Sequence, residues 1–232
     1  MPRGKQPNSS RSIWSPPLTV RRLSIYLRYL EELANQGQQT VSSRQLGQAL
    51  GLTDAQVRKD LAWFGHMGRP GVGYRVAAMV EQLRAIFGTD KVSSVAVIGV
   101  GSLGRALLRY KGFLSKGFRL SAAFDVSPQR IGRSLGECVV QPLDELEKVI
   151  AQQGIRIVIL AVPAAVAQEM ADRLVRAGIV GILNFAPVTL TVPEGIAVIP
   201  VDMAVQLEQL AYMINAPRPG VSGRPRRRQS SG

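Results

Sequence analysis

Three glycines, Gly99, Gly101 and Gly104, give the chain a Gly-x-Gly-x-x-Gly pattern. An apolar run precedes this pattern and a helical pattern follows it. A second apolar run ends at Asp125, about 20 residues further on. This context is typical of a strand, a phosphate-binding turn and a helix whose free N–H groups face a pyrophosphate. The pattern therefore predicts a dinucleotide site that includes Gly99, Val100, Gly101, Ser102, Leu103, Gly104 and Asp125.

Each residue type in the pattern has its own physical role. Gly99 allows the tight turn, Gly101 lets the backbone approach the pyrophosphate, and Gly104 lets the helix pack closely on the strand. Asp125 can accept hydrogen bonds from the adenosine ribose and would repel a 2′-phosphate, which favours NAD(H) over NADP(H). An alternative stays open, in which the stretch is a glycine-rich turn of an α/β fold that binds no ligand.

Composition limits the class of protein. With 232 residues and 46% hydrophobic residues, the chain is long enough for one or two domains with a substantial core. The single cysteine, Cys138, rules out an internal disulfide and a cysteine-based metal cluster. No apolar run approaches about 18 residues, and residues 1–12 lack the apolar core of a secretory signal. We therefore expect a cytoplasmic protein that does not span a membrane and binds no metal.

Positive charge is concentrated at the two ends of the chain. Residues 1–90 carry a formal charge of +6, residues 91–214 only +2, and residues 215–232 carry +5 without any acidic residue. The region of the glycine pattern is therefore nearly neutral. The basic N-terminal third favours a polyanionic partner, with charge that serves only solubility as the alternative.

The N-terminal third predicts a helix-turn-helix over about residues 24–63. A long amphipathic helix is expected over about 20–36, with Thr19 as a possible N-cap and Gly37 at its end. Two short helices should follow, at 44–50 with a cap at Ser42 or Ser43, and from Thr53 or Asp54 to about residue 64. The glycine-rich stretch 65–76 would then return as a hairpin, which is a wing.

The second short helix is the candidate for reading DNA. Gln56 and Arg58 have side chains that can bond base edges bidentately, and Lys59 can hold a phosphate. Arg69 would place positive charge at the wing. The expected DNA-binding residues are Ser43, Gln56, Arg58, Lys59 and Arg69. The alternative is an ordinary helical subdomain with a solvated basic face.

Beyond about residue 91, buried strands alternate with amphipathic helices, which predicts a parallel sheet covered on both faces. The fold class is therefore α/β Rossmann, doubly wound, with an N-terminal winged-helix domain. A final helix, capped by Asp202, is apolar on nearly all sides, so it should be buried against its own sheet or a second subunit. The expected parts are an arm (1–17), a winged-helix domain (18–77), a connecting helix (78–90), a Rossmann domain (91–201), the last helix (202–214) and a basic tail (215–232).

A winged helix joined to an NAD-type fold, with these local strings, resembles the Rex family of bacterial redox-sensing transcriptional repressors. The resemblance covers nearly all of 18–214. It is carried by Val57-Arg58-Lys59-Asp60-Leu61, Gly71-Val72-Gly73-Tyr74, Gly99 to Gly104, Ala123-Phe124-Asp125, Ala161-Val162-Pro163, Gly181-Ile182-Leu183-Asn184-Phe185-Ala186-Pro187 and Val201-Asp202. The string Gly-Ile-Leu-Asn-Phe-Ala-Pro is especially specific.

The resemblance implies a homodimer that exchanges its last helix, represses from an inverted-repeat operator when NAD⁺ prevails, and leaves the DNA when NADH binds. It also implies that the nicotinamide end of the cofactor lies beside Ala161, Val162, Pro163, Asn184, Phe185, Ala186 and Pro187. The redox switch would pair Asp202 alternately with Arg28 and Tyr110.

Two other functions compete with a repressor. An NAD-dependent oxidoreductase would need a proton donor or base and a substrate compartment. The only histidine, His66, lies in the predicted wing, and one helix and a tail after the last strand leave no room for a substrate domain. A CoA-binding α/β module shares the glycine turn, but it would not explain the helix-turn-helix.

Overall fold

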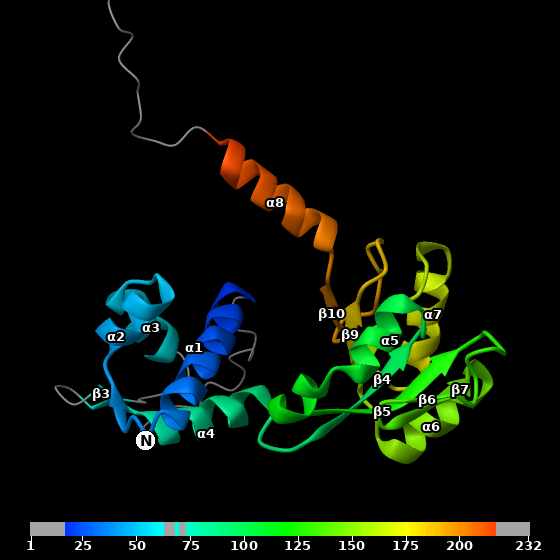
Figure 1. Ribbon diagram of the computed structural model, residues 1–232, viewed down its shortest axis with the longest axis horizontal. Coiled ribbons are helices and arrows are strands. Elements are labelled where there is room, and N and C mark those ends of the chain that lie inside the picture. The colour runs from blue at the N-terminus through cyan, green and yellow to red at the C-terminus, as the bar shows by residue number, and fades with distance from the viewer. Residues whose placement is uncertain (1–16, 63–67, 70–72, 217–232) are drawn as a thin grey trace, which may run out of the picture. The chain divides into compact units, whose positions relative to one another are not determined.

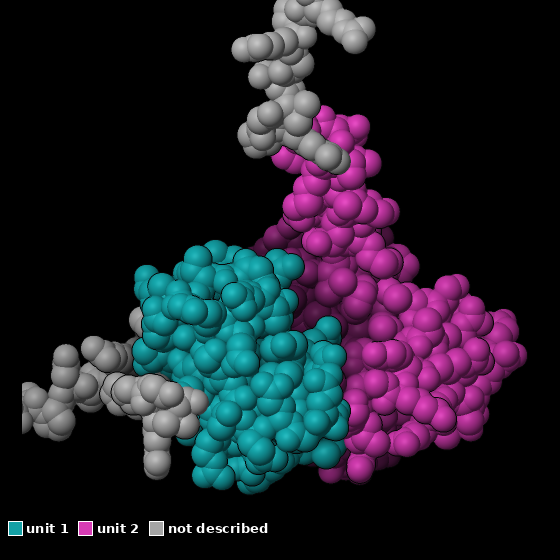
Figure 2. Space-filling model, turned by 60° about the vertical axis from the view of Figure 1, so that its left-hand side comes forward, with its two compact units in different colours: residues 1–92 teal, residues 93–232 magenta. Residues whose placement is uncertain are grey.

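A computed structural model of the chain describes residues 17–62, 68–69 and 73–216. The chain divides into two compact units, residues 1–92 and 93–232 (Figure 2). The division falls between Val92 and Ser93, just after the helix that the sequence analysis expected to connect the two domains.

In its described residues, the first unit has four helices and a small antiparallel sheet (Figure 1). The helices are α1 (Pro17–Asn35), α2 (Ser43–Leu50), α3 (Asp54–Ala62) and α4 (Val76–Phe87). The strands are β1 (Thr40–Val41), β2 (Gly68–Arg69) and β3 (Gly73–Arg75), in the order β1-β3-β2. Helices α2 and α3 are the predicted helix-turn-helix, and β2 and β3 are the described strands of the predicted wing.

Local sequence explains how α2 and α3 begin and end. The Ser42 side chain accepts a hydrogen bond from Gln45 N–H, and the Gln45 side chain accepts one from Ser42 N–H, so the two residues form a capping box. Gly51 ends α2 with a left-handed backbone, φ +68°. The Thr53 hydroxyl then accepts Gln56 N–H at the start of α3. Of the alternative caps, Ser42 and Thr53 are therefore the ones used.

The second unit contains one seven-stranded sheet with the order β10-β9-β8-β4-β5-β7-β6. Its strands are β4 (Ser93–Ile98), β5 (Phe118–Asp125), β6 (Ser134–Leu135), β7 (Cys138–Pro142), β8 (Ile157–Leu160), β9 (Gly181–Asn184) and β10 (Ala197–Pro200). The helical elements are α5 (Ser102–Arg109), η1 (Lys111–Lys116), η2 (Leu143–Glu145), α6 (Leu146–Gln153), α7 (Ala164–Arg176) and α8 (Met203–Asn215). All strand pairs are parallel except β6 with β7.

The strand order identifies the fold. Numbered along the chain, the six parallel strands lie in the order 3-2-1-4-5-6, which is the Rossmann arrangement. The first strand, β4, lies between β5 and β8, so the order reverses on its β8 side. In such sheets, ligands bind at the carboxyl ends of the strands at this reversal. The predicted fold class is confirmed.

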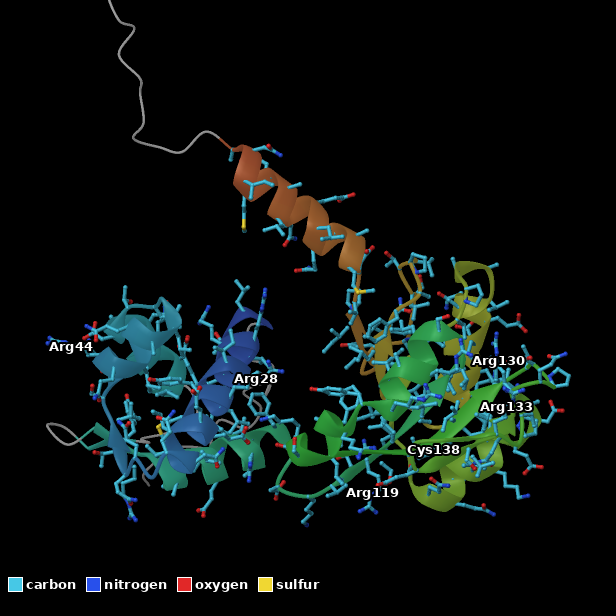
Figure 3. All side chains as sticks on the ribbon, viewed as in Figure 1. Arg28, Arg44, Arg119, Arg130, Arg133 and Cys138 are labelled. Atoms are coloured by element: carbon cyan, nitrogen blue, oxygen red, sulfur yellow. The ribbon has the colours of Figure 1, made fainter. Side chains whose placement is uncertain are left out.

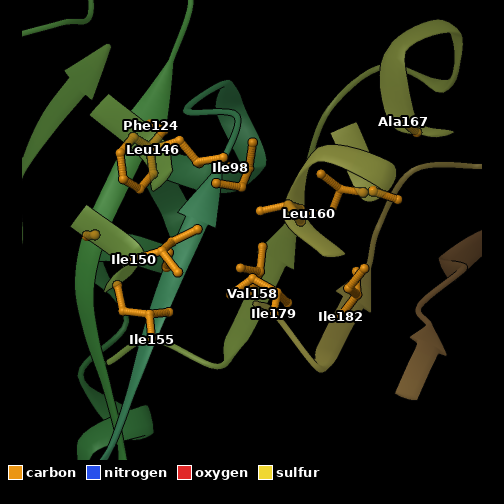
Figure 4. Close-up of a cluster of buried hydrophobic side chains, with 14 of the residues drawn as sticks. Ile98, Phe124, Leu146, Ile150, Ile155, Val158, Leu160, Ala167, Ile179 and Ile182 are labelled. Carbon is orange, nitrogen blue, oxygen red and sulfur yellow. The ribbon is translucent and has the colours of Figure 1, made fainter. Parts of the chain in front are cut away.

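Both faces of the large sheet are covered by apolar side chains. On one face, Ile98, Phe124, Leu160 and Ile182 pack with residues of α6 and α7 (Figure 4). On the other, Val97 and Ile159 pack with Leu108 of α5. A buried sheet of this kind holds the ends of its strands in fixed positions, and the candidate nucleotide site lies at these ends.

Several sequence expectations need correction. Helix α1 begins at Pro17, and Thr19 is a buried residue within it and not a cap; proline is tolerated in the first turn, where its missing N–H costs nothing. The short elements β6 and η1 were not expected. The last helix, α8, was expected to be buried against its own sheet or a second subunit, and every one of its residues is exposed in the single chain. Its apolar side chains therefore have no partner on their own sheet among the described residues.

Candidate functional site

The glycine turn lies at the reversal of strand order, between the ends of β4 and β8. Gly99 has φ +89°, which side chains other than glycine rarely adopt. A Cβ on Gly99 would collide with the Ala161 carbonyl oxygen just after β8. The Ala161 N–H donates to the Ile98 carbonyl at 2.8 Å. The fold thus brings two of the predicted stretches, at Gly99 and at Ala161, into contact.

The other two glycines differ sharply in their surroundings. A Cβ on Gly104 would collide with the Gly99 carbonyl, so α5 packs closely on the turn as predicted. A Cβ on Gly101 would meet nothing within 4 Å, and its φ of −68° suits any residue. Gly101 N-caps α5, where unpaired helix N–H groups favour a phosphate. The chain itself has no need for glycine at 101, whereas a ligand lying against the backbone would need it.

Asp125 ends β5 beside this turn and is bound by its neighbours. Its Oδ2 accepts Val100 N–H at 2.7 Å, and its Oδ1 accepts Ser127 N–H at 2.8 Å. Burial alone would raise the pKa of Asp125, but these two donors and Arg130 outweigh it and hold the pKa below its usual value. The side chain is therefore a carboxylate at neutral pH, only 3% exposed.

The predicted nicotinamide stretch after β9 is shaped by a buried amide. Asn184 is 1% exposed, and its Nδ2 donates to the carbonyls of Ala186 and Val188 at 3.2 and 2.8 Å. Its Oδ1 accepts Ala186 N–H at 3.0 Å. Since these bonds go to its own loop, Asn184 fixes the backbone shape of residues 184–188. Phe185 is half-buried and Pro187 is exposed.

Helix α3 presents the basic residues predicted to contact DNA. Arg58 and Lys59 are exposed. Arg58 Nη1 donates to Asp54 Oδ2 at 2.7 Å and to Ser43 Oγ at 3.3 Å. The structure therefore brings together Ser43 and Arg58, which were predicted separately, and holds the guanidinium by two contacts.

Sequence reasoning missed one basic residue of this surface. Arg44, the second residue of α2, is exposed, and its charge helps to lower the pKa of Asp54 (Figure 3). The Arg58 hydrogen bond is the largest influence on that pKa. The sequence could have indicated Arg44. It directly follows Ser43, so both residues lie in the first turn of α2.

A buried carboxylate, Asp60, fixes α3 on α1. Asp60 is 3% exposed and accepts two hydrogen bonds from Arg22, at 2.5 and 2.8 Å, and one from the Tyr26 hydroxyl at 2.8 Å. It also accepts Gln56 Nε2 at 2.7 Å. Burial and the hydrogen bond from the Tyr26 hydroxyl to Asp60 both raise the pKa of Tyr26. We call Arg22, Tyr26, Gln56 and Asp60 the Asp60 network.

The Asp60 network corrects the expectation for Gln56. That residue was predicted to be exposed and to read bases, but it is half-buried and its amide donates to Asp60. The spacing of four residues puts Gln56 and Asp60 on one face of α3, and that face turns toward α1. Within the described residues no group of His, Cys, Asp and Glu could hold a metal ion.

Comparisons with known proteins match both units. A family described as "Putative DNA-binding protein N-terminus" matches residues 16–62, and one described as "CoA binding domain" matches residues 90–188. A redox-sensing transcriptional repressor Rex from Carboxydothermus hydrogenoformans is 47% identical over 86% of this chain and 96% of its own length. Another from Rhodopirellula baltica is 46% identical over 91% and 89%. The chain belongs to the Rex family.

Solved structures of the Rex family match across both units. The crystal structure of RSP in complex with β-NAD⁺ and operator DNA covers 87% of this chain and 93% of its own, with a TM-score of 0.83 and 39% identity. That of RSP in complex with β-NADH covers 87% and 94%, with a TM-score of 0.79 and 38% identity.

The residues expected to form the Rex redox switch are all exposed. Arg28 lies on α1, Tyr110 follows α5, and Asp202 caps α8 by accepting Ala204 and Val205 N–H groups. Tyr110 stacks edge-on against Phe113 and lines a hollow of about 440 Å³ with Lys111 and Arg119. Within the second unit, no hydrogen bond joins Tyr110 to Asp202 in the described part of the chain.

The predicted wing is only partly described. Arg69 is the last residue of β2, which pairs with β3 through Arg69 opposite Gly73. His66 lies outside the described residues. No helix among the described ranges is long and apolar enough to cross a membrane.

Proposed function

We propose that this protein is a redox-sensing transcriptional repressor, and not an enzyme, that binds operator DNA as a dimer and is released when NADH replaces NAD⁺. The observation that carries this proposal is the match of both units, at a TM-score of 0.83, to a Rex-family repressor bound to β-NAD⁺ and operator DNA. A repressor must reach the DNA that it regulates, so we also propose a cytoplasmic location.

The residues at the strand reversal fit a dinucleotide. Gly101 leaves room beside the backbone at the start of α5, and Asp125 is an ionised acceptor at the end of β5. We propose that residues 99–104 hold the pyrophosphate, and that residues 161–163 and 184–187 surround the nicotinamide. The bound cofactor supplies a ring that is cationic when oxidised and neutral when reduced.

The DNA surface that we propose consists of Ser43, Arg44, Arg58, Lys59 and Arg69. In a dimer, two copies of α3 would enter major grooves one helical turn or a multiple of it apart, which requires an inverted repeat. Asp54 and Ser43 orient the Arg58 guanidinium before DNA arrives. Such orientation favours a defined contact with a base edge over loose attraction to phosphates.

Replacing Arg58 with Ala should weaken operator binding by about 5- to 150-fold at fixed salt, because one good base contact contributes about 1–3 kcal/mol. The loss should be larger on operator DNA than on a scrambled duplex, and fluorescence anisotropy can measure both. Arg84→Ala is the matched control. This substitution removes the same charge from the first unit, but Arg84 pairs with Glu31 on α1 and is not part of the proposed DNA surface. Equal losses for the two variants would show that Arg58 contributes only charge.

The exposed apolar face of α8 supports the dimer. Leu207, Leu210, Met213 and Ile214 are each more than half exposed, which is unusual for a water-soluble surface. We propose that a second copy of the chain covers them and that Asp202 pairs alternately with Arg28 and Tyr110. The two conformations with these pairings must differ in their affinity for NADH, because a ligand that binds both equally well would not change their populations.

Replacing Asp202 with Ala should leave operator binding intact, but the variant should no longer release the operator when NADH is added. Because Asp202 also caps α8, the Ala variant loses about 1 kcal/mol of helix stability. Asp202→Asn separates the two roles, since Asn caps a helix as well as Asp but carries no charge. We expect both variants to resist NADH in an anisotropy titration. Normal release by the Asn variant would rule out the carboxylate as the switch.

A CoA-binding module is the second candidate, because the family described as "CoA binding domain" matches residues 90–188. Both CoA and NAD(H) offer a pyrophosphate to the glycine turn. Two of the structures matched over both units carry β-NAD⁺ or β-NADH, which favours the dinucleotide. Isothermal titration with NADH, NAD⁺ and CoA tests the choice directly. Tight binding of CoA alone would overturn it.

A further inference from the structure

The hollow beside Tyr110, of about 440 Å³, lies at the amino ends of the strands of the large sheet. Its lining includes Phe118, Arg119 and Leu120, which begin β5, whereas Asp125 ends the same strand beside the glycine turn. A strand rises about 3.3 Å per residue, so the two ends of β5 are about 23 Å apart. The hollow is therefore a different place from the candidate dinucleotide site.

The floor of the hollow is apolar and continuous with the core of the second unit. Leu108 is 6% exposed, and the partly buried side chains of Phe113, Phe118 and Leu120 pack against the same cluster. One wall comes from η1 and another from the turn between β6 and β7. In that turn, a Cβ on Gly136 would collide with the Leu108 carbonyl oxygen, so glycine lets the turn close against the end of α5. Packed backbone and buried side chains thus set the shape of the hollow.

The Tyr110 ring is a further wall, and its neighbours hold it in place. It meets the Phe113 ring edge-on, with the ring centroids 5.1 Å apart and the planes at 82°. A Cβ on Gly112 would collide with the Tyr110 ring, so glycine at this position makes room for it.

The rim of the hollow is positively charged. Arg109, Lys111 and Arg119 line it and are exposed, whereas Glu137 is the one acidic residue in its lining. Within the described ranges, the side chains of these three cations make no hydrogen bond or ion pair. Cations above an apolar floor suit a ligand that combines an apolar body with an anionic group. A neutral ligand would leave the cations unused, and an inorganic anion would gain nothing from the floor.

We propose that this hollow is a binding site for a small amphipathic anion. The apolar chain or ring of the ligand lies on Phe113, Phe118 and Leu120, and its carboxylate or phosphate is held by the cations of the rim. The volume fits, because small-molecule pockets in proteins span about 300–1,000 Å³. The site goes beyond the proposed function, since it needs neither the dinucleotide nor DNA.

Isothermal titration of the full chain with octanoate tests the ligand class. Octan-1-ol has the same apolar chain without the charge, and acetate has the charge without the chain. We expect octanoate to bind one site per chain, and the other two to bind at least about tenfold more weakly, because each lacks one half of the recognition. Octyl phosphate, compared with octanoate, shows whether the rim prefers a phosphate or a carboxylate.

Charge reversal at the rim tests the location. Arg119→Glu should weaken octanoate binding by at least about tenfold, because one attractive charge becomes repulsive. Lys111→Glu, on η1, should have the same effect from a different element of the fold. Arg133→Glu is the matched control, since Arg133 is an exposed arginine of the same unit that does not line the hollow (Figure 3). This variant should bind octanoate within about threefold of the wild type, and melting curves check that all three variants are folded.

Several results would overturn the proposal. One is that neither octanoate nor octyl phosphate binds. Another is an equal loss in Arg133→Glu, because the ligand would then respond only to net charge. Unchanged binding in Arg119→Glu and Lys111→Glu would place octanoate elsewhere, such as on the exposed apolar face of α8.

A contact between two copies of the chain is the other possible occupant of the hollow. In that case Arg119→Glu and Lys111→Glu would lower the mass in solution, measured by light scattering, and this result too would overturn the proposal. We expect both variants to keep the mass of the wild type. Since none of these measurements involves NADH or operator DNA, their failure would leave the proposed function standing.

Discussion

Replacing Asp60 with Asn should destabilise the first unit by about 3 kcal/mol, because the change breaks a buried charged network. The amide has nearly the shape of the carboxylate, so the core around it stays filled. However, it carries no charge, and its NH₂ group faces the donors of Arg22, Tyr26 and Gln56. Thermal or urea unfolding of the variant, followed by circular dichroism, measures the loss.

The same network predicts a dependence on pH. Burial would raise the pKa of Asp60, but hydrogen bonds from Arg22, Tyr26 and Gln56 lower it below its ordinary value. Its contribution to stability is therefore complete above the unfolded pKa of about 4 and is lost as the pH falls through the lower folded pKa. Asp60→Asn should lack this part of the acid dependence.

Asp54 provides the matched control for Asp60. Like Asp60, it lies on α3 and bonds an arginine, but its pair with Arg58 is exposed. Asp54→Asn should therefore leave the unfolding midpoint unchanged. If Asp60→Asn were as stable as Asp54→Asn, the Asp60 network would not be what fixes α3 on α1.

Replacing Gly101 with Ala should lower the affinity for NADH roughly 100-fold without changing the stability of the protein. The added methyl group would touch nothing in the chain within 4 Å, and the backbone of Gly101 suits any residue. It would instead stand where the pyrophosphate must approach the start of α5. Fluorescence titration with NADH and a melting curve measure the two quantities on one sample.

Gly104 gives the opposite result from the same substitution. Its Cβ would collide with the Gly99 carbonyl, so Gly104→Ala should destabilise the second unit by about 3 kcal/mol. The two glycines therefore separate the roles of ligand contact and packing. An Ala variant of Gly101 that melts early, or one that binds NADH normally, would contradict the placement of the pyrophosphate.

The sequence predicted the parts of the site that depend on local backbone. Gly99, Gly104 and Asp125 lie as expected because a strand, a glycine turn and a helix that are adjacent in sequence can form only a few arrangements. Ser42 and Thr53 were each one of two possible caps. Their choice depended on hydrogen-bond geometry that composition alone cannot fix.

Features that depend on tertiary contacts were less predictable. Gln56 was misjudged because its position on α3 gives no sign that Asp60 is buried against Arg22 and Tyr26 of α1. Arg130 lies five residues after Asp125, in a stretch read only as a turn, and its contact depends on how that turn folds back. In both cases the partner is set by packing and not by periodicity.

The shortest elements were also missed, and the partner of the last helix stayed open. Strand β6 has only two residues, which is too short to show an alternating pattern. It pairs with β7 across a turn at Gly136, φ +60°. The apolar residues of α8 indicated burial, but a sequence cannot say whether the covering surface comes from the same chain. The dimer therefore stays a proposal that α8 supports.

The most direct test is to measure the affinity of the purified protein for an inverted-repeat operator at fixed salt, while the ratio of NADH to NAD⁺ is varied at constant total concentration. We predict tight, sequence-specific binding in NAD⁺ that falls steeply as NADH replaces it. Specific binding that does not respond to the ratio would contradict redox sensing, and binding that does not distinguish the operator from scrambled DNA would contradict a repressor.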